Sequence, residues 1–155
     1  MKSLIVYVSI HHENTKKLID ALKKNYDVDL LDAVKKAGDK DFSQYDTIGF
    51  ASGIYNGSIS SALFKIVQEN AGALRQKKIF AIITSGTKNR RYCTKTQKVF
   101  EENNIQLEDV YQCLGYDSNG LWAKIGGIAK GHPNKEDIDD LLKFVENRML
   151  LPVSK

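Results

Sequence analysis

The chain has 155 residues, of which 42% are hydrophobic and 27% charged, and its formal net charge is +4 at pH 7. These values are typical of one globular domain over residues 1–155, and the charge is too small to indicate nucleic-acid binding. No apolar run approaches the ~20 residues that span a bilayer, and the N-terminal apolar stretch is too short for a signal peptide. The two cysteines lack metal-type spacing and indicate a reducing compartment, so we expect a cytoplasmic protein with no membrane partner.

Five apolar runs predict strands, and amphipathic stretches between them predict helices. The predicted strands are Ser3–Ser9, Val28–Asp32, Thr47–Ser52, Lys78–Ser85 and Leu107–Leu114. A 3.6-residue period predicts helices over Thr15–Lys24, Ser60–Ala71, Thr94–Asn103 and Asn134–Met149. Alternating strands and helices are typical of a parallel sheet with helices on both faces. Ligands of such sheets bind at the carboxyl ends of the strands, so the loops at those ends form the candidate site.

The loop after the first strand is the most informative part of the chain. It leads from a buried strand into a helix, whose first N–H groups lack partners within the helix and therefore bind anions. The loop contains no glycine, which excludes a Gly-x-Gly-x-x-Gly dinucleotide fingerprint and a Walker-type phosphate loop. Its polar side chains suit a terminal phosphate monoester, and they are Ser9, His11, His12, Asn14 and Thr15. The alternative is that Asn14 or Thr15 only caps the helix.

Two later loops carry groups that suit a flat ligand. The loop after the third strand contains Ser52, Gly53, Ile54, Tyr55, Asn56 and Gly57. Asn56-Gly57 predicts a turn, and Tyr55 either stacks on a ligand or packs under its own loop. The loop after the fourth strand contains Thr84, Ser85, Gly86 and Thr87. Its cations Lys88, Arg90 and Arg91 either meet an anionic ring or an acidic partner, or form a solvated surface.

The segment Gly115–His132 is unusually long for a connection and holds the only tryptophan. Connections of this length are often functional. Tyr116 and Trp122 could frame a flat ligand or a partner surface, and the alternative for Trp122 is a core anchor for the segment.

Taken together with the strand and helix pattern, these loops make the chain resemble a flavodoxin. The family's first loop reads Ser/Thr-x-Thr-Gly-x-Thr and holds the phosphate of FMN. Here Tyr7-x-Ser9 and Asn14-Thr15-Lys16 match its two ends, and His11-His12-Glu13 forms its middle. The chain is similar to a branch of flavodoxin-domain proteins with a His-His-x-Asn-Thr loop, and Gly126–Asp137 also looks like that branch.

The resemblance covers all five predicted strands. It implies a three-layer α/β/α sandwich in which a five-stranded parallel sheet has the order 2-1-3-4-5, with FMN bound at the strand ends. It also implies that the loops Ser52–Gly57 and Thr84–Tyr92 flank the flavin ring.

The resemblance implies an FMN-binding redox protein whose flavin supplies the chemistry, so we expect no catalytic side chain and no metal. We expect electron transfer with a redox partner protein, which the basic charge predicts to be acidic, and a monomer or homodimer. A small FMN-dependent NAD(P)H reductase acting on a quinone or similar acceptor is the first alternative. The second is a flavin-free regulatory module, because an inward-pointing Glu13 would oppose a phosphate. We expect Glu13 to point outward.

Overall fold

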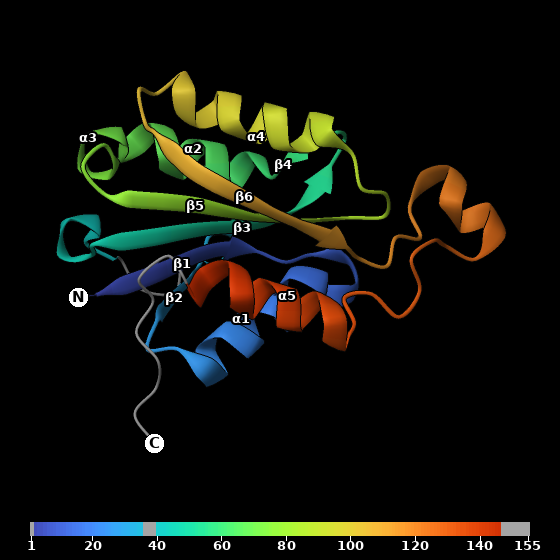
Figure 1. The fold of residues 1–155 in the computed structure, drawn as a ribbon. Helices are drawn as coiled ribbons and strands as arrows, with labels where there is room; N and C mark the ends of the chain where they lie inside the picture. The colour runs from blue at the N-terminus through green and yellow to red at the C-terminus, as the bar shows by residue number, and fades with distance from the viewer. Residues whose placement is uncertain (1, 36–39, 147–155) are drawn as a thin grey trace.

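The structure, a computed structural model, describes residues 2–35 and 40–146. Its sheet has the order β2-β1-β3-β5-β6, and all pairs along this path are parallel (Figure 1). These strands are β1 (Ser3–Val8), β2 (Asp29–Asp32), β3 (Thr47–Tyr55), β5 (Lys78–Ser85) and β6 (Leu107–Leu114). Counted without the short antiparallel β4 (Ser58–Ile59), this is the predicted order 2-1-3-4-5, which is confirmed.

Helices cover both faces of the sheet, as the predicted three-layer sandwich requires. Figure 1 shows α1 (Asn14–Asn25) and α5 (Lys135–Glu146) on one face, and α2 (Ser61–Glu69) and α4 (Arg90–Glu101) on the other. The shorter elements are α3 (Ala71–Leu74) and the 3-10 helices η1 (His11–Glu13), η2 (Phe42–Gln44) and η3 (Gly120–Ile125). None of the helices in the described ranges is long and apolar enough to cross a membrane.

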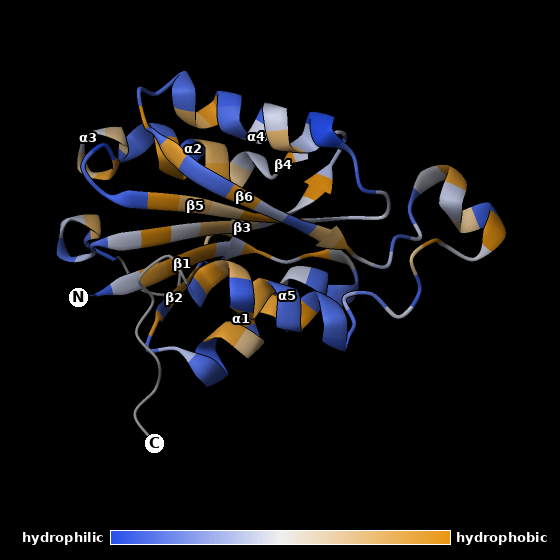
Figure 2. Cartoon of the chain, in the orientation of Figure 1, coloured by the Kyte–Doolittle hydropathy of each residue, from blue (hydrophilic) through white to orange (hydrophobic). Residues whose placement is uncertain are grey.

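The central strands β1, β3 and β5 bury side chains on both faces, which explains their continuous apolar runs. Along β1, Leu4 and Val6 belong to the core under α2 and α4, whereas Ile5 and Tyr7 belong to the core under α1 and α5. Figure 2 shows the same arrangement, with hydrophobic positions concentrated on the strands and on the helix faces that meet them. The two cores fix the strand ends relative to one another and therefore position the loops of the site.

Two element boundaries differ from the prediction for identifiable reasons. Helix α4 begins at Arg90 instead of Thr94, because the Asn89 side chain accepts a hydrogen bond from the Arg91 N–H at 2.9 Å and caps it there. Strand β3 continues to Tyr55, because Asn56 and Gly57 turn the chain back into β4. Both turn residues have positive φ, 52° and 83°, as a tight hairpin turn requires. Residues 147–149 of the predicted last helix lie outside the described residues.

Candidate functional site

The carboxyl ends of β1, β3, β5 and β6 surround an open cleft of about 380 Å³, a volume that includes the solvent at its mouth. The predicted site residues that line it are Ser9, Asn14, Thr15, Gly53, Ile54, Tyr55, Thr84, Ser85 and Gly86. The structure thus brings residues from all three predicted loops into one cleft.

The loop between β1 and α1 adopts a backbone shape that normally needs glycine. His12 and Glu13 both have left-handed φ values, 55° and 52°. Ser9 Oγ accepts a hydrogen bond from the Lys16 N–H at 3.0 Å and so satisfies a donor of the first turn of α1. Glu13 makes no side-chain cap bond and its side chain is exposed outside the cleft lining, which is the outward orientation we expected.

Asn14 and Thr15 join the first loop to the other walls of the cleft. The Asn14 side-chain amide donates to the Tyr116 carbonyl at 2.8 Å, and the buried hydroxyls of Thr15 and Thr84 lie 3.4 Å apart. The Asn14 Oδ1 atom is buried and meets no hydrogen-bond donor of the described residues. A buried acceptor without a partner costs free energy, which a donor on a bound ligand would recover. Gly115 permits this arrangement, since a Cβ there would lie 2.7 Å from Asn14 Nδ2.

Tyr55 lies across the β3 side of the cleft. Its hydroxyl would be 2.9 Å from a Cβ placed on Gly53, so glycine leaves the room that the phenol occupies. Burial raises the pKa of Tyr55, while backbone groups of Ile10 and Gly53 act in the opposite direction. Tyr55 therefore packs over its own loop and lines the cleft as well. Its stacking on a ligand stays a prediction.

Several predicted site residues have other contacts and do not line the cleft. Ser52 is buried, donates to the Gly53 carbonyl at 2.6 Å and accepts from the Ser60 N–H at 3.0 Å, so it holds the β3–β4 hairpin. Asn56 and Gly57 form the hairpin turn, and the Thr87 carbonyl accepts from Ser85 Oγ at 2.7 Å. The His11 side chain lies outside what the structure describes. A contact between any of these residues and a ligand stays a prediction.

His12 turns toward the segment after β6 instead of the cleft. Its Nε2 atom lies 2.7 Å from Ser118 Oγ, and its ring centroid is 4.1 Å from that of Tyr116. His12 thus ties the first loop to the cleft's fourth wall without lining the cleft itself.

That fourth wall is the part of the site that the prediction left open. The segment contains η3 and closes on itself through a bridge between Asp117 and Ile128. A Cβ on Gly86 would lie 2.7 Å from Ile128 and 2.8 Å from Asp117, so the segment packs directly against the end of β5. Besides Tyr116, it contributes Gly115, Asp117 and Asn119 to the lining, and the first loop adds Ile10. Trp122 is exposed, so the core-anchor alternative is wrong.

The comparisons with known proteins agree with this architecture. A flavodoxin domain family model matches residues 4–117. An uncharacterised protein of Methanocaldococcus jannaschii is 30% identical over 149 residues, which cover 95% of this chain and 97% of the relative. A flavodoxin from the domain Archaea superimposes with a TM-score of 0.64 at 16% identity, covering 92% of each chain. The general stress protein 14 of Treponema denticola, solved in complex with FMN, has a TM-score of 0.60 at 16% identity and covers 95% of this chain and 99% of that one.

The order of the parallel strands and a cleft at their carboxyl ends define an α/β protein of the flavodoxin-like class. The match of the family model over most of the chain makes the assignment specific, and the chain belongs to the flavodoxin domain family.

Proposed function

We propose that the chain binds FMN in the cleft and transfers electrons. The observation that carries the proposal is the N-terminus of α1, where Asn14 and Thr15 line a cleft and Asn14 Oδ1 is buried without a donor. FMN offers a phosphate, which accepts hydrogen bonds, and ribityl hydroxyls, which can donate to such an oxygen. The FMN complex of the Treponema denticola protein on the same fold supports the proposal.

The cleft lining favours a single phosphate group over a nucleotide with several. Among the described residues that line it, Asp117 has the only charged side chain, and none is Lys, Arg or His. Neutral donors at a helix N-terminus suffice for one phosphate, whereas NADPH carries three and would gain from cations. This composition favours FMN over a dinucleotide as the occupant of the cleft.

The remaining lining suits the flavin ring. Ile54 and Tyr55 come from the end of β3, and Ser85 and Gly86 come from the end of β5. The bound flavin would supply the redox chemistry. The chain's own residues would bind the ring, orient it and limit its contact with water, for which no acid–base side chain is needed.

The phosphate contact can be tested by comparing FMN with riboflavin, which lacks the phosphate. We expect Thr15→Ala to weaken FMN binding about tenfold or more, since a hydrogen bond to a charged group contributes roughly 1.5–3 kcal/mol. Riboflavin should be affected much less. Thr15→Ser keeps the hydroxyl and serves as the matched control. Equal losses for the two flavins, measured by fluorescence titration, would show that Thr15 does not contact the phosphate.

The choice between carrier and reductase needs a separate assay. We expect the FMN-loaded chain alone to oxidise NADPH no faster than free FMN does, with or without an added quinone. Rapid, saturable NADPH oxidation would support the reductase instead. Neither result would bear on whether the chain retains FMN, which is measured separately.

A further inference from the structure

An ordered projection with an apolar tip stands beside the cleft. Figure 1 shows η3 extending beyond the carboxyl end of the sheet. Its Leu121, Trp122 and Ile125 are 77%, 40% and 67% exposed. Over the described ranges, the other exposed large apolar residues are Val34 and Ile10, and Ile10 lines the cleft. Apolar groups gathered in this way on a surface mark an interaction site.

The projection is held in place by its own hydrogen bonds. The Gly127 N–H donates to the Trp122 carbonyl at 2.8 Å, and the Tyr116 hydroxyl donates to the Gly126 carbonyl at 3.1 Å. At its base, Asp117 and Ile128 exchange backbone hydrogen bonds at 3.0 and 2.7 Å. Because Tyr116 and Asp117 line the cleft, the base of the projection forms a wall of the cleft, and a partner bound to the tip would lie at the end of the molecule where the cleft opens.

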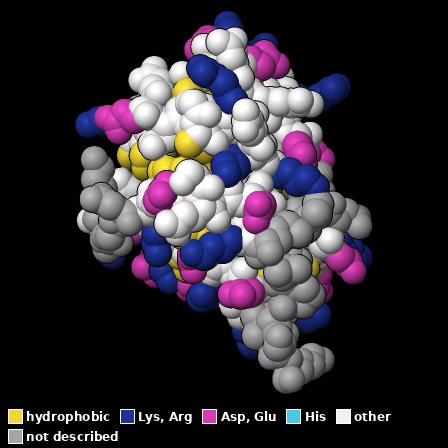
Figure 3. Space-filling view, turned by 90° about the vertical axis from the view of Figure 1, so that its left-hand side faces the viewer, with side chains coloured by type: hydrophobic (Ala, Val, Ile, Leu, Met, Phe, Trp, Pro, Cys, Tyr) yellow, Lys and Arg dark blue, Asp and Glu magenta, His cyan; other side chains and the backbone are white. Residues whose placement is uncertain are grey.

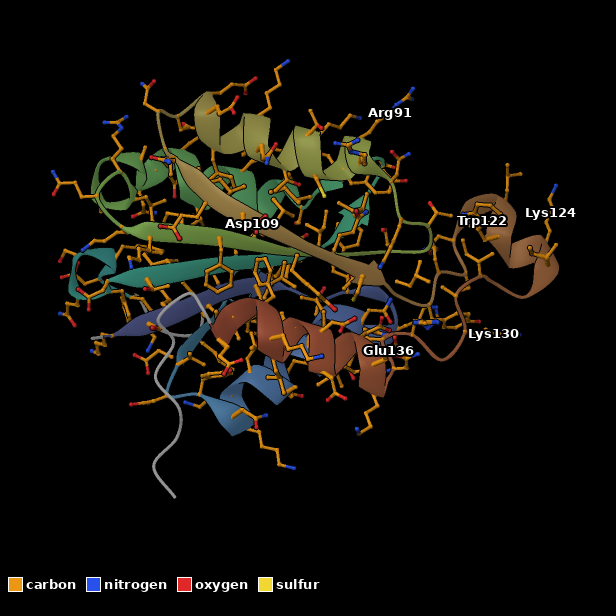
Figure 4. The ribbon with its side chains drawn as sticks, in the orientation of Figure 1. Arg91, Asp109, Trp122, Lys124, Lys130 and Glu136 are labelled. Carbon is orange, nitrogen blue, oxygen red and sulfur yellow. The ribbon has the colours of Figure 1, made fainter. Side chains whose placement is uncertain are left out.

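Cations lie at the same end of the molecule as the apolar tip. Lys124 and Lys130 belong to the projection, residues 118–135 contain no Asp or Glu, and the β5–α4 connection adds exposed cations. Within the described part of the chain, no ion pair involves Lys88, Arg90, Arg91, Lys124 or Lys130. Figure 4 places Arg91, Trp122, Lys124 and Lys130 at the same end of the molecule, where Glu136 is a nearby anion. By contrast, the opposite end mixes both signs of charge (Figure 3).

We propose that the η3 surface, defined as Leu121, Trp122, Lys124, Ile125 and Lys130, docks an acidic electron-transfer protein. This inference rests on the proposed function. An apolar centre with a cationic rim complements a partner with an apolar centre and an acidic rim. A second copy of this chain fits poorly, because its lysines would meet like charges. One electron would pass from the reduced partner to the flavin, so that the partner is oxidised and no covalent bond forms or breaks.

A reduced, acidic plant-type [2Fe–2S] ferredoxin is a suitable probe, since its low reduction potential makes it a strong electron donor. We expect its second-order rate of FMN reduction in the loaded chain to fall about tenfold as salt rises from low to high concentration. The double variant Lys124→Glu and Lys130→Glu should lower this rate by a similar factor at low salt. The control, Lys24→Glu and Lys98→Glu, makes the same change in net charge at the far ends of α1 and α4. It should change the rate less than about twofold, because screening limits long-range effects.

The apolar contact has its own readout in the chain without flavin. Trp122 is the only tryptophan, so its emission reports on binding of the ferredoxin at this surface. We expect saturable, salt-sensitive quenching, and we expect Leu121→Ser to weaken binding at least about fivefold, as for a residue at the centre of an interface.

Each negative result points to a different conclusion. Equal rates for the two double variants, or no salt dependence, would overturn the docking surface while leaving flavin binding intact. Failure of the wild-type chain to retain FMN would remove the proposed function, whereas ferredoxin binding to the flavin-free chain would still be measurable. Binding to vesicles of phosphatidylcholine and phosphatidylserine that Leu121→Ser abolishes, with unchanged electron transfer, would assign the tip to lipid and overturn the proposal.

Discussion

At the scale of single residues, the first loop holds two residues with left-handed backbone, His12 and Glu13, whose side chains differ in the contacts they make. Left-handed backbone costs a non-glycine residue roughly 1–2 kcal/mol. His12 offsets this cost through its contacts with Ser118 and Tyr116. Glu13 has an exposed side chain and makes no cap bond. The loop therefore holds a backbone conformation that glycine adopts without strain, and the strain is concentrated at Glu13.

This difference predicts the effect of Glu13→Gly. The variant should raise the free energy of unfolding by about 1 kcal/mol, because glycine adopts positive φ without strain, and FMN binding should tighten or stay unchanged. Glu13→Gln keeps the strain and removes the charge, so FMN binding should again tighten or stay unchanged, but without the gain in stability. Chemical denaturation and FMN titration measure the two effects, and a large loss of FMN affinity in Glu13→Gly would show that Glu13 supports the site.

A second residue-scale prediction concerns the pair of Tyr45 and Asp29, whose side chains are hydrogen-bonded at 2.6 Å. The bond lowers the pKa of Asp29, so its stabilising contribution is present above the ordinary value of 3.8 and is lost as the pH falls through the folded-state pKa. Burial raises the pKa of Tyr45 to about 12, so its contribution is present below the unfolded value of 10.0 and is lost as the pH rises through about 12.

We therefore expect Tyr45→Phe to lower the free energy of unfolding by about 1 kcal/mol at neutral pH, and by less in acid once Asp29 is protonated. Tyr26→Phe is the control, because the Tyr26 hydroxyl donates to an uncharged carbonyl, that of Leu142, at 3.3 Å. Its effect should not change between neutral and acidic pH. Urea unfolding at several pH values tests this, and a deficit in Tyr45→Phe that stays constant into acid would contradict the assignment.

At the scale of elements, the packing of the projecting segment against β5 depends on Gly86. Gly86→Ala should destabilise the chain by roughly 1–3 kcal/mol, because the new Cβ would meet Ile128 and Asp117 below 3.0 Å. It should also speed hydrogen exchange at the Asp117 and Ile128 amides. Gly72→Ala in α3 places its Cβ in open space and should stabilise by about 0.5–1 kcal/mol. Equal changes in the free energy of unfolding for the two variants would show that the segment does not pack against Gly86.

The sequence predicted β1 and β5 well because buried parallel strands appear as continuous apolar runs. The edge strand β6 is less buried and its pattern alternates more, yet the bounds predicted for β5 and β6 both match those observed. It missed the start of α4 because the first turn is polar and the cap at Asn89 is a local contact without periodicity. Strand β4 was missed because two residues are too short for a pattern, although Asn56-Gly57 correctly indicated a turn.

The site was predicted only in part, because some of its residues have a local sequence signature and others do not. Ser9, Asn14 and Thr15 lie at a strand–helix junction, which has a local sequence signature. The wall formed by Asp117 and Asn119 depends on how the segment after β6 folds back, which local patterns do not encode. Only its length and aromatic residues indicated a role.

At the scale of the whole molecule, the sheet order brings four strand ends together, and the exposed apolar residues of η3 project from that same end. A ligand that binds only the folded chain should stabilise it as a whole. FMN at a hundredfold excess over its dissociation constant would add about 2.7 kcal/mol to the free energy of unfolding. A thermal melt with and without FMN measures this, and the melting temperature should rise with FMN concentration.

The central claim is that the cleft binds FMN through its phosphate. The most direct measurement is an equilibrium titration of the purified chain with FMN and with riboflavin, followed by gel filtration to detect retained flavin. We expect one FMN to co-elute with each chain and riboflavin to bind at least about tenfold more weakly, because riboflavin lacks the charge-assisted contact of the phosphate. A chain that retains no FMN, or that binds both flavins equally, would contradict the claim.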